Sequence, residues 1–343
     1  MAIDHTELDT DRSKETKQPT VLDRIQQTMS AEIEAMNGII RSSLATDHPL
    51  VNSIIDNYLL TKGKQIRPIL VMLSARMFGA ITETVLHSAA ALEMLHNATL
   101  IHDDVVDQTP LRRGRPTVNA VWGNHLAVLS GDIFVSKALS TGVRTRNLAI
   151  LDTLSALGTE LSLGEMDQLF NARSHVLNKD AYFDMIGRKT ASLFVGCVRI
   201  GAQAVGASEE EFGSLERFAR LLGLAFQIRD DIFDYFPSDD IGKPSGHDLL
   251  EGKVTLPILA ALESAPAEKA EEVRTLLLGD CEFSPEEVAR IQRFAIDNGG
   301  IEVARAEMRR LQEEGLEILH TYPSSPARGY FEEIFDFIIE RTL

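Results

Sequence analysis

The sequence predicts an all-α fold of roughly ten or more helices, and three observations support this. Apolar residues recur at spacings of three and four, as Ile25, Met29, Ile33 and Met36 do, which places them on one helical face. No stretch alternates apolar and polar residues between turn signals, as a half-buried strand would. Helix start and stop signals also follow one another directly near the C-terminus, so little room is left for other structure.

The elements follow in chain order. Residues 1–19 are polar and mixed in charge, so we expect a disordered leader rather than a signal peptide, and the first helix begins near Val21. The apolar run at residues 191–207 holds Arg199 and three glycines, which indicates a buried core helix and not a membrane span. Ser284 begins a capping box with proline at the first helical position, and the helix it opens stops at Asn298-Gly299-Gly300. A further helix is expected over residues 301–319.

Composition limits the classes of function. The chain has 343 residues, and since nothing in mid-chain resembles a linker, residues 20–343 are predicted to form one domain. The formal net charge of −17 argues against nucleic acid as a partner, because phosphate backbones bind basic surfaces. The cysteines Cys197 and Cys281 lie too far apart in sequence for a zinc or disulfide pattern, which favours a reducing, cytoplasmic location.

Two identical acidic clusters indicate a metal site. Each reads Asp-Asp-x-x-Asp, at residues 103–107 and 230–234, and each follows a strongly apolar helical run. The first and last aspartates lie one helical turn apart, and like charges at that spacing destabilise a bare helix. Mg²⁺ prefers carboxylate oxygens and binds phosphate oxygens alongside them. One such cluster could be a solvated helix end, but two that each close a buried helix favour a metal centre whose halves face each other.

Cationic side chains accompany both clusters. Lys64 and Arg67 are three residues apart and are expected to share a helical face, and His96 lies two turns before Asp103 on the same helix. The others are Arg112, Arg113, Lys189, Lys243 and Lys253. Arginine presents a planar fork to phosphate oxygens, and lysine presents a point charge. Singly, each would be an ordinary surface charge. Beside the clusters they predict that metal ions and cations together hold a phosphorylated substrate.

These motifs, taken together and in order, resemble the polyprenyl synthetase family. The matching strings are Gly-Lys-Gln-Ile-Arg-Pro at 63–68, Leu-Ile-His-Asp-Asp-Val-Val-Asp at 100–107, Arg-Arg-Gly-Arg-Pro-Thr at 112–117, Gly-Asp at 131–132, Gly-Glu at 164–165 with Gln168, Lys-Thr-Ala-Ser-Leu-Phe at 189–194, Phe-Gln-Ile-Arg-Asp-Asp-Ile-Phe-Asp at 226–234, Gly-Lys-Pro at 242–244, and Asp248 with Gly-Lys-Val-Thr-Leu-Pro at 252–257. The resemblance implies one large helical domain around a central active-site cavity, usually as a homodimer. It also implies a trans-prenyltransferase that joins isopentenyl diphosphate to an allylic prenyl diphosphate. We expect no membrane span, although the release of an apolar product could involve peripheral membrane contact.

Residue roles are carried over from the resemblance position by position. The catalytic set is Asp103, Asp104, Asp107, Asp230, Asp231, Asp234 and Lys189, in which Asp103, Asp107, Asp230 and Asp234 would hold about two or three Mg²⁺ ions, with Mn²⁺ as a possible substitute. The isopentenyl diphosphate site would consist of Lys64, Arg67, His96 and Arg113. The allylic diphosphate site would consist of Arg112, Lys189, Thr190, Gln227, Lys243 and Lys253.

Product length should depend on the helix behind Asp103. The family's short-chain members tend to carry an aromatic residue one turn before this motif, whereas Ala98 and Thr99 are small, with Leu95 next along that face. Small residues at these positions leave the route of the growing prenyl chain open, which predicts a long product of about C30 or more. A floor for the growing tail is expected from Leu163, Met166 or Phe170 on a facing helix. Plain core packing by small residues is the alternative.

Other readings of the sequence remain open. A short-chain farnesyl or geranylgeranyl diphosphate synthase would use the same motifs. A non-catalytic subunit of a heteromeric prenyl synthase would be expected to lose motif aspartates, yet all six are present. A class I terpene cyclase usually has Asn, Ser/Thr and Glu at its second metal site and needs no isopentenyl diphosphate site. A metal-dependent phosphohydrolase would need a positioned water or nucleophile, for which the sequence offers no candidate.

Overall fold

The computed structural model describes residues 20–60, 63–236, 246–279 and 283–340, and these are almost entirely helical. In chain order the elements are α1 (Val21–Thr28), α2 (Ser30–Leu44), α3 (Pro49–Leu59), α4 (Ile66–Phe78), α5 (Glu83–Val106), β1 (Leu111–Arg112), β2 (Arg115–Pro116), α6 (Val118–Trp122), α7 (Asn124–Arg144), α8 (Leu148–Arg173), α9 (Lys179–Ile186), the π-helical turn η1 (Gly187–Ala191), α10 (Ser192–Ala204), α11 (Glu209–Phe233), α12 (His247–Leu250), α13 (Leu256–Ser264), α14 (Ala267–Leu277), α15 (Pro285–Asp297), α16 (Gly300–Leu319) and α17 (Pro326–Glu340). The predicted all-α class and single helical domain are confirmed. The expected leader at residues 1–19 lies outside the described residues.

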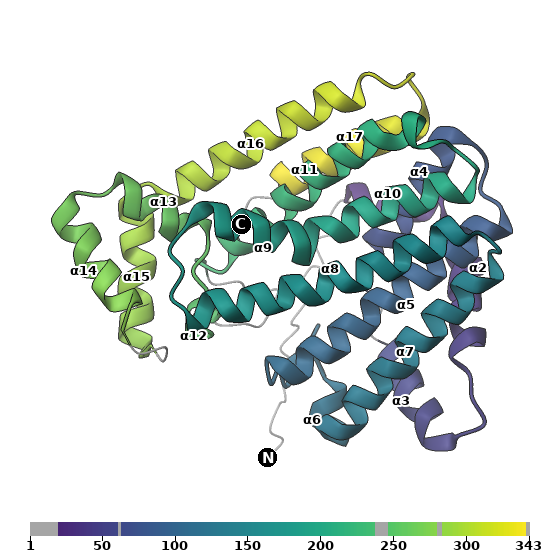
Figure 1. Cartoon of the computed structure of the whole chain (residues 1–343), viewed down its shortest axis with the longest axis horizontal. Helices are drawn as coiled ribbons and strands as arrows, with labels where there is room; N and C mark the ends of the chain where they lie inside the picture. Colours follow the sequence, from purple (N-terminus) through teal and green to yellow (C-terminus); the bar gives the residue numbers. More distant parts are fainter. Residues whose placement is uncertain (1–19, 61–62, 237–245, 280–282, 341–343) are drawn as a thin grey trace, which may run out of the picture.

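Long helices packed side by side form the body of the molecule. α5 packs against α4, α7 and α10, while α10 also packs against α8 and α11 (Figure 1). α16 and α17 cover α11, and the shorter helices α13, α14 and α15 gather at one end. α5 and α10 are therefore buried on most sides, which explains their nearly continuous apolar sequences.

The helix ends follow the sequence signals. Ser284 accepts a hydrogen bond from the Glu287 backbone amide, and the Glu287 carboxylate accepts one from the Ser284 amide, so the predicted capping box is present. α15 ends at Asp297 and α16 runs to Leu319, as expected. The first apolar face, which includes Ile25 and Met29, is buried as predicted, but the chain forms two helices there because α1 ends at Thr28.

A small hairpin corrects the expectation that the chain has no strands. β1 and β2 pair antiparallel within the polar loop that follows α5, and Leu111 lies opposite Pro116. The two residues at the tip, Arg113 and Gly114, have φ angles of 52° and 73°. Positive φ at both positions is the conformation of a type I′ turn, which matches the twist of a two-residue hairpin. A two-residue strand is too short to show alternation, so the sequence pattern could not reveal it.

One described helix, α7, has the length and apolar composition that could cross a membrane, with a mean hydropathy of 1.3 over its most apolar window. Only 39% of that window is buried within the fold. The buried side, which includes Phe134 and Ala138, packs against α5, whereas Leu129 and Val143 on the other side are each 58% exposed. The apolar run at residues 191–207, by contrast, forms the buried helix α10 as predicted.

Candidate active site

The two acidic clusters occupy equivalent places in their helices. Asp103 to Asp107 form the last turn and C-cap of α5, and Asp230 to Asp234 form the last turn and C-cap of α11. A helix C-terminus carries unsatisfied carbonyl oxygens and a partial negative charge, so carboxylates there are unfavourable without nearby cations. Both clusters therefore lie where a positive charge is needed most.

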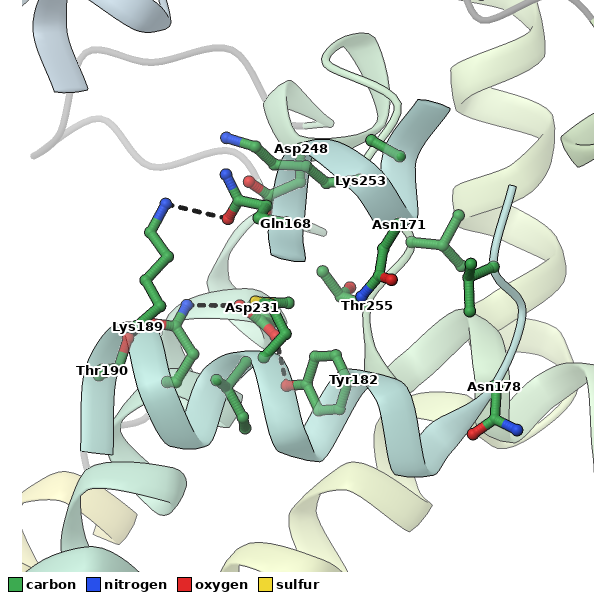
Figure 2. Close-up of a pocket in the computed structure, with 16 residues that line it drawn as sticks. Gln168, Asn171, Asn178, Tyr182, Lys189, Thr190, Asp231, Asp248, Lys253 and Thr255 are labelled. Carbon is green, nitrogen blue, oxygen red and sulfur yellow. Dashed lines mark hydrogen bonds between the residues drawn. The ribbon is translucent and has the colours of Figure 1, made fainter. Parts of the chain in front are cut away.

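Lysine side chains bridge the space between the clusters. Lys253 Nζ lies 3.8 Å from the Asp107 carboxylate and contacts Glu251, and it also lines the pocket that contains Asp231. Lys189 Nζ lies 2.5 Å from the Glu165 carboxylate and 3.0 Å from Gln168 Oε1 (Figure 2). Lys189 also interacts electrostatically with Asp103 and Asp107. Both lysines therefore interact with the first cluster and line the pocket that holds Asp231 of the second, and a single metal centre formed by the two clusters stays a prediction.

The turn η1 places Lys189 in this pocket. An added Cβ at Gly164 would lie 2.4 Å from the Lys189 backbone nitrogen, so α8 approaches η1 closely only because residue 164 is glycine. That approach brings the neighbouring Glu165 to Lys189. Single π-helical turns inside helices are frequent at functional sites, and this one holds two predicted site residues, Lys189 and Thr190.

The first cluster is held through its middle residue. Asp104 is 2% exposed and accepts hydrogen bonds from Arg112 Nε at 2.8 Å and Arg112 Nη2 at 2.7 Å. Arg112 was predicted to bind the allylic diphosphate, and here its guanidinium group is paired with the cluster itself. The type I′ turn at Arg113-Gly114 then sends the two adjacent arginines to different places, since Arg113 lies against Gly63 instead.

The second cluster is held by a hydrogen-bond chain. Tyr182 Oη donates to Asp231 Oδ2 at 2.5 Å, and Gln227 Nε2 donates to Asp231 Oδ1 at 2.8 Å (Figure 2). Thr190 Oγ1 in turn donates to Gln227 Oε1 at 2.6 Å. Both carboxylate oxygens of Asp231 therefore accept hydrogen bonds. Of the residues predicted for the allylic diphosphate site, Gln227 bonds to Asp231 directly and Thr190 bonds to Gln227.

The outer carboxylates of the second cluster have other partners. Asp230 pairs at 2.7 Å with Arg229, a buried arginine that stacks on the Phe226 ring with its guanidinium carbon 4.6 Å from the centroid. Asp234 accepts hydrogen bonds from the backbone amides of His247 and Asp248. These bonds tie the end of α11 to α12.

The pKa values of the carboxyl groups show that positive charge is lacking. Burial, reinforced by the nearby Glu165 carboxylate, raises the pKa of Asp103 to about 7. Burial and the Asp248 carboxylate raise the pKa of Asp231, and burial together with Asp234 raises that of Asp248. Burial also raises the pKa of Asp107. These buried carboxyl groups offer only oxygen donors, and their raised pKa values mean that the ionised forms are disfavoured. A hard divalent cation fits such a site, because it would supply the positive charge that the ionised forms need.

The carboxylates are not already gathered around a metal position. Across the described part of the chain, no three or more His, Cys, Asp or Glu side chains form a group that could hold an ion. Asp104, Asp107 and Asp230 instead pair with Arg112, Lys253 and Arg229. Binding of a metal would therefore require some of these ion pairs to rearrange.

A second cationic group lies deeper along α5. Arg67, His96 and Arg113 interact electrostatically with one another, and the two arginines also interact with the buried carboxyl group of Glu93. Arg67 Nε is buried and has no hydrogen-bond partner among the described residues, so it is available to an oxygen ligand. Burial and the neighbouring arginines lower the pKa of His96 well below its usual value. The imidazole is therefore neutral at pH 7 and would bind a phosphate as a hydrogen-bond donor rather than as a cation.

The position of Lys64 differs from the one predicted from the sequence. It was expected to share a helical face with Arg67, but α4 begins only at Ile66 and Gln65 has a φ angle of 49°. Lys64 consequently points toward the C-terminal helix α17, with its Nζ 5.6 Å from the centroid of the Phe337 ring. Arg67, His96 and Arg113 come together in this structure, and a part for Lys64 in the same site stays a prediction.

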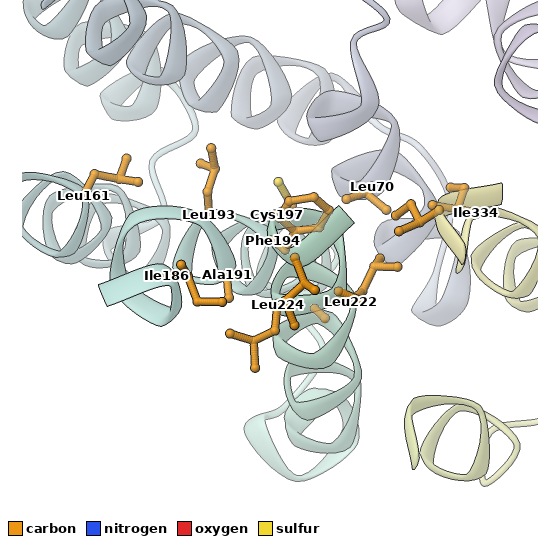
Figure 3. Packing of buried hydrophobic residues seen from close by; sticks show 14 of the residues in the cluster. Leu70, Leu161, Ile186, Ala191, Leu193, Phe194, Cys197, Leu222, Leu224 and Ile334 are labelled. Carbon is orange, nitrogen blue, oxygen red and sulfur yellow. The ribbon is translucent and has the colours of Figure 1, made fainter. Parts of the chain in front are cut away.

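The predicted chain-length residues line the wall of α5. Ala98 is fully buried, Leu95 is 5% exposed, and Thr99 donates a hydrogen bond to the His96 carbonyl. The prediction that a floor for the growing prenyl chain comes from Leu163, Met166 or Phe170 is wrong. These side chains are 37%, 64% and 64% exposed on the outer side of α8. A different part of α8, with Leu157 and Leu161, faces inward toward Leu193 and the rest of the core (Figure 3).

The sequence did not identify every residue of the site. Tyr182 lies in an ordinary amphipathic helix, and nothing in the pattern marks it. Glu93 could have been noticed, since a single acidic residue inside the apolar run of α5 is unusual. Glu165 and Asp248 were part of matching strings without an assigned role. Lys243, predicted for the allylic site, lies outside the described residues.

Comparisons with known proteins agree with this geometry. Residues 48–293 match the family model described as polyprenyl synthetase. The chain is 34% identical to a short chain isoprenyl diphosphate synthase of Methanothermobacter thermautotrophicus over 88% of this chain and 94% of that protein. It is 35% identical to an all-trans-nonaprenyl-diphosphate synthase (geranyl-diphosphate specific) of Rhodobacter capsulatus over 91% and 96% of the two chains. A crystal structure of a polyprenyl synthase from Caulobacter crescentus, complexed with calcium and isoprenyl diphosphate, superposes with a TM-score of 0.86 and 31% identity, covering 95% and 99% of the chains.

Proposed function

Since the chain belongs to the polyprenyl synthetase family and is a prenyltransferase, we propose that it joins isopentenyl diphosphate to an allylic prenyl diphosphate with Mg²⁺, giving a long-chain all-trans polyprenyl diphosphate. The observation that supports this most is that Lys189 and Lys253 interact with the first acidic cluster and line the pocket that holds Asp231 of the second. The related structure complexed with calcium supports a divalent metal at such a site.

The metal ions, when bound by Asp103, Asp107, Asp230 and Asp234, would neutralise charge on the departing diphosphate. Lys189 and Lys253 are positioned to stabilise the same charge, since each can exchange its carboxylate partner for a phosphate oxygen. The allylic C–O bond breaks, and the double bond of isopentenyl diphosphate forms the new C–C bond with the resulting cation. A proton is then lost from the adjacent carbon, and the released diphosphate is the base we propose for it.

Isopentenyl diphosphate is proposed to bind at Arg67, His96 and Arg113. Arg67 interacts electrostatically with both Glu93 and Asp230, so this group lies next to the second cluster. A diphosphate bound there would place the second substrate beside the allylic one, which lowers the entropic cost of the encounter. Glu93 offsets the charge of the two arginines when no substrate is bound.

The long-chain assignment rests on Ala98. A fully buried alanine one turn before Asp103, followed by Leu95, leaves the wall of α5 free of a bulky side chain. The similar proteins include both a short-chain and a nonaprenyl synthase, so product length must be measured on this chain. A short-chain synthase remains the alternative assignment.

The experiment is to incubate the purified chain with Mg²⁺, farnesyl diphosphate and labelled isopentenyl diphosphate, and to separate the dephosphorylated products by chromatography. We expect a ladder that ends at about C30 or longer, and a shorter limit for Ala98→Phe, because the aromatic ring would block the route. Products that stop at C15 or C20 in the unaltered chain would contradict the long-chain proposal and leave the enzyme class intact. No incorporation by the folded chain would favour a subunit that needs a different partner chain.

We also propose that the chain forms a homodimer through the outer faces of α7 and α8. The exposed apolar residues on these adjacent helices are Val128, Leu129, Leu139 and Val143 of α7 and Leu163, Met166 and Phe170 of α8. Exposed apolar side chains that gather on neighbouring helices are typical of an interaction surface. Sedimentation of the unaltered chain should give a dimer, and Leu129→Glu should give a monomer, because a charge at the centre of the interface would be buried without a partner.

A further inference from the structure

A groove separate from the active site runs along the outside of the seam between α8 and the segment η1–α10. Its volume is about 410 Å³, whereas the pocket lined by Lys189, Asp231 and Lys253 measures about 60 Å³. Ligand sites in proteins commonly measure about 300–1,000 Å³, so the groove is large enough for a small molecule. None of the residues that line it belongs to either acidic cluster or to the predicted diphosphate sites.

Part of the groove is apolar and closely packed, beside the polar side chains of Thr153 and Ser192. Ala156 and Leu157 of α8 lie opposite Val195 and Gly196 of α10. An added Cβ at Gly196 would lie 2.9 Å from Leu157 Cδ2, so the two helices meet here without a gap. An aliphatic chain could lie on this apolar part, but it could not pass between the helices into the core.

Three arginines from three different elements line the groove: Arg188 of η1, Arg199 of α10 and Arg220 of α11. Arg199 donates through Nε and Nη2 to Glu216, which leaves its Nη1 available. Arg188 donates through Nη1 to Asp167 at 3.1 Å, with Glu160 at 3.9 Å from its Nε. These carboxylates fix two guanidinium groups in place without using all of their donors.

Arg220 has no such partner. It makes no hydrogen bond or ion pair with any described residue, and its guanidinium group lies over Gly187, where an added Cβ would be 2.9 Å from Nη2. The groove is also lined by the carboxylates of Glu160 and Asp184, and Glu160 lies 3.9 Å from Arg188 Nε, so Arg220 carries the unpaired positive charge. An unpaired guanidinium group beside the apolar side chains of Leu157 and Val195 is complementary to an anionic head group on an aliphatic chain. In a chain with a net charge of −17, such a site stands out from the general surface.

The groove and the active site share the turn η1. Arg188 and Gly187 form part of the groove, whereas Lys189 and Thr190, the next residues, bond to Gln168 and Gln227 in the active-site pocket. A ligand that contacts the outer side of this five-residue turn would therefore affect the position of Lys189 on its inner side. Single π-helical turns inside helices are frequent at functional sites, and this one joins the groove to the active-site pocket.

We propose that this groove is a regulatory site for a small phosphorylated amphiphile. The phosphate binds Arg220 and the free donors of Arg188 and Arg199, and the aliphatic chain lies along Leu157 and Val195. The occupant changes the rate of prenyl transfer through η1. The same chemistry is presented by a free prenyl phosphate and by the head group of an anionic lipid.

The test uses decyl phosphate below its micellar concentration, with binding measured by calorimetry on the full chain in EDTA. Arg220→Ala should weaken binding at least tenfold. Arg217→Ala, which removes an exposed arginine three residues earlier on α11 and outside the groove, should leave it unchanged. Lys253→Ala should also leave it unchanged, because Lys253 lines the active-site pocket and lies outside η1. Equal binding by Arg220→Ala and the unaltered chain would overturn the proposal, as would loss of binding in Lys253→Ala.

Further measurements test the aliphatic chain of the ligand and the source of the ligand. They also test its effect on prenyl transfer. Inorganic phosphate should bind much more weakly than decyl phosphate, and equal binding would contradict the amphiphile assignment. Flotation with vesicles of phosphatidylcholine, with and without phosphatidylglycerol, distinguishes the sources: Arg220-dependent binding to the anionic vesicles supports a lipid head group, and binding of the soluble probe alone supports a free prenyl phosphate.

Decyl phosphate should change the initial rate of prenyl transfer in the unaltered chain and in Arg217→Ala but not in Arg220→Ala. If Arg220→Ala does not fold, Arg220→Lys, which keeps the charge without the fork, replaces it. A rate that responds equally in all variants would contradict the regulatory role.

Discussion

The clusters at the ends of α5 and α11 have the same spacing of aspartates but different surroundings. In the first, the middle residue Asp104 is bound by a charged partner, Arg112. In the second, the middle residue Asp231 is bound by neutral groups, the Tyr182 hydroxyl and the Gln227 amide. In both, the middle aspartate is buried and fixed by side-chain hydrogen bonds, whereas the outer aspartates are more exposed. Identical motifs can therefore share a division of roles while using different interactions to maintain it.

The outer carboxylates differ as well. Asp103 interacts with Glu165 and Lys189 and has the pKa of about 7 that burial produces. Asp230 is paired with Arg229, and Asp234 is fixed by two backbone amides. The outer aspartates of the first cluster thus have only exchangeable side-chain partners, Lys189 and Lys253, whereas in the second cluster Asp234 is fixed by the backbone. We expect the first cluster to depend more strongly on metal ions.

The largest effect is expected from removing an outer carboxylate of the first cluster. Asp103→Asn should lower kcat on the order of 10³-fold, because a metal ligand that acts in the transition state is lost. Asp230→Asn should lower it less, since Asp234 remains fixed nearby. Steady-state kinetics over a range of Mg²⁺ concentrations, with metal binding measured separately by calorimetry, would check this. Asp297→Asn, an exposed aspartate on α15, is the control, and equal losses at the two positions would remove the proposed difference.

A pH effect on stability follows from Asp103. Its pKa is about 7 in the folded chain and about 3.9 in an unfolded chain, so the folded state binds the proton more tightly. The free energy of unfolding of the metal-free chain should therefore fall as pH rises from about 4 to 7, by on the order of 4 kcal/mol at most. Urea unfolding in EDTA at pH 5 and pH 8 would measure it. Mg²⁺ should restore stability at pH 8, and Asp103→Asn should reduce the pH dependence; a flat profile would count against the buried-charge explanation.

The two middle aspartates should differ in their contribution to folding. Asp104→Asn leaves the Arg112 guanidinium group partly buried without its counter-ion, which should cost about 3 kcal/mol. Asp231→Asn keeps an oxygen for Tyr182 and disturbs a neutral hydrogen bond, so about 1 kcal/mol is expected. Denaturant midpoints of the two variants beside Asp297→Asn provide the comparison. Equal destabilisation would show that the two middle aspartates are held by the same kind of interaction.

The smallest effect is expected from Tyr182→Phe. It removes one hydrogen bond to Asp231 while Gln227 still holds the other oxygen, so the loss of stability should be about 1 kcal/mol. The KM for the allylic substrate should rise a few-fold, because Thr190 and Gln227 belong to the same chain of hydrogen bonds. Phe183→Leu, on the adjacent position of α9, is a control for packing. A change in stability without any change in KM would limit Tyr182 to a structural role.

The sequence by itself determined the all-α class, the helix ends marked by Ser284 and Asn298, and the two acidic clusters with candidate cations such as Lys189 and Lys253. These depend on local signals: helical periodicity, caps and short motifs act within a few residues of where they are read. Tertiary structure decided the rest. The backbone at Gln65 turns Lys64 away from Arg67, and burial sets the pKa of His96. Packing of α8 places Leu161 inside and Phe170 outside, and only the approach of α9 to α11 gives Asp231 its tyrosine partner. The physical reason is that side-chain direction and solvation depend on which elements meet, and neither spacing nor composition in one segment contains that information.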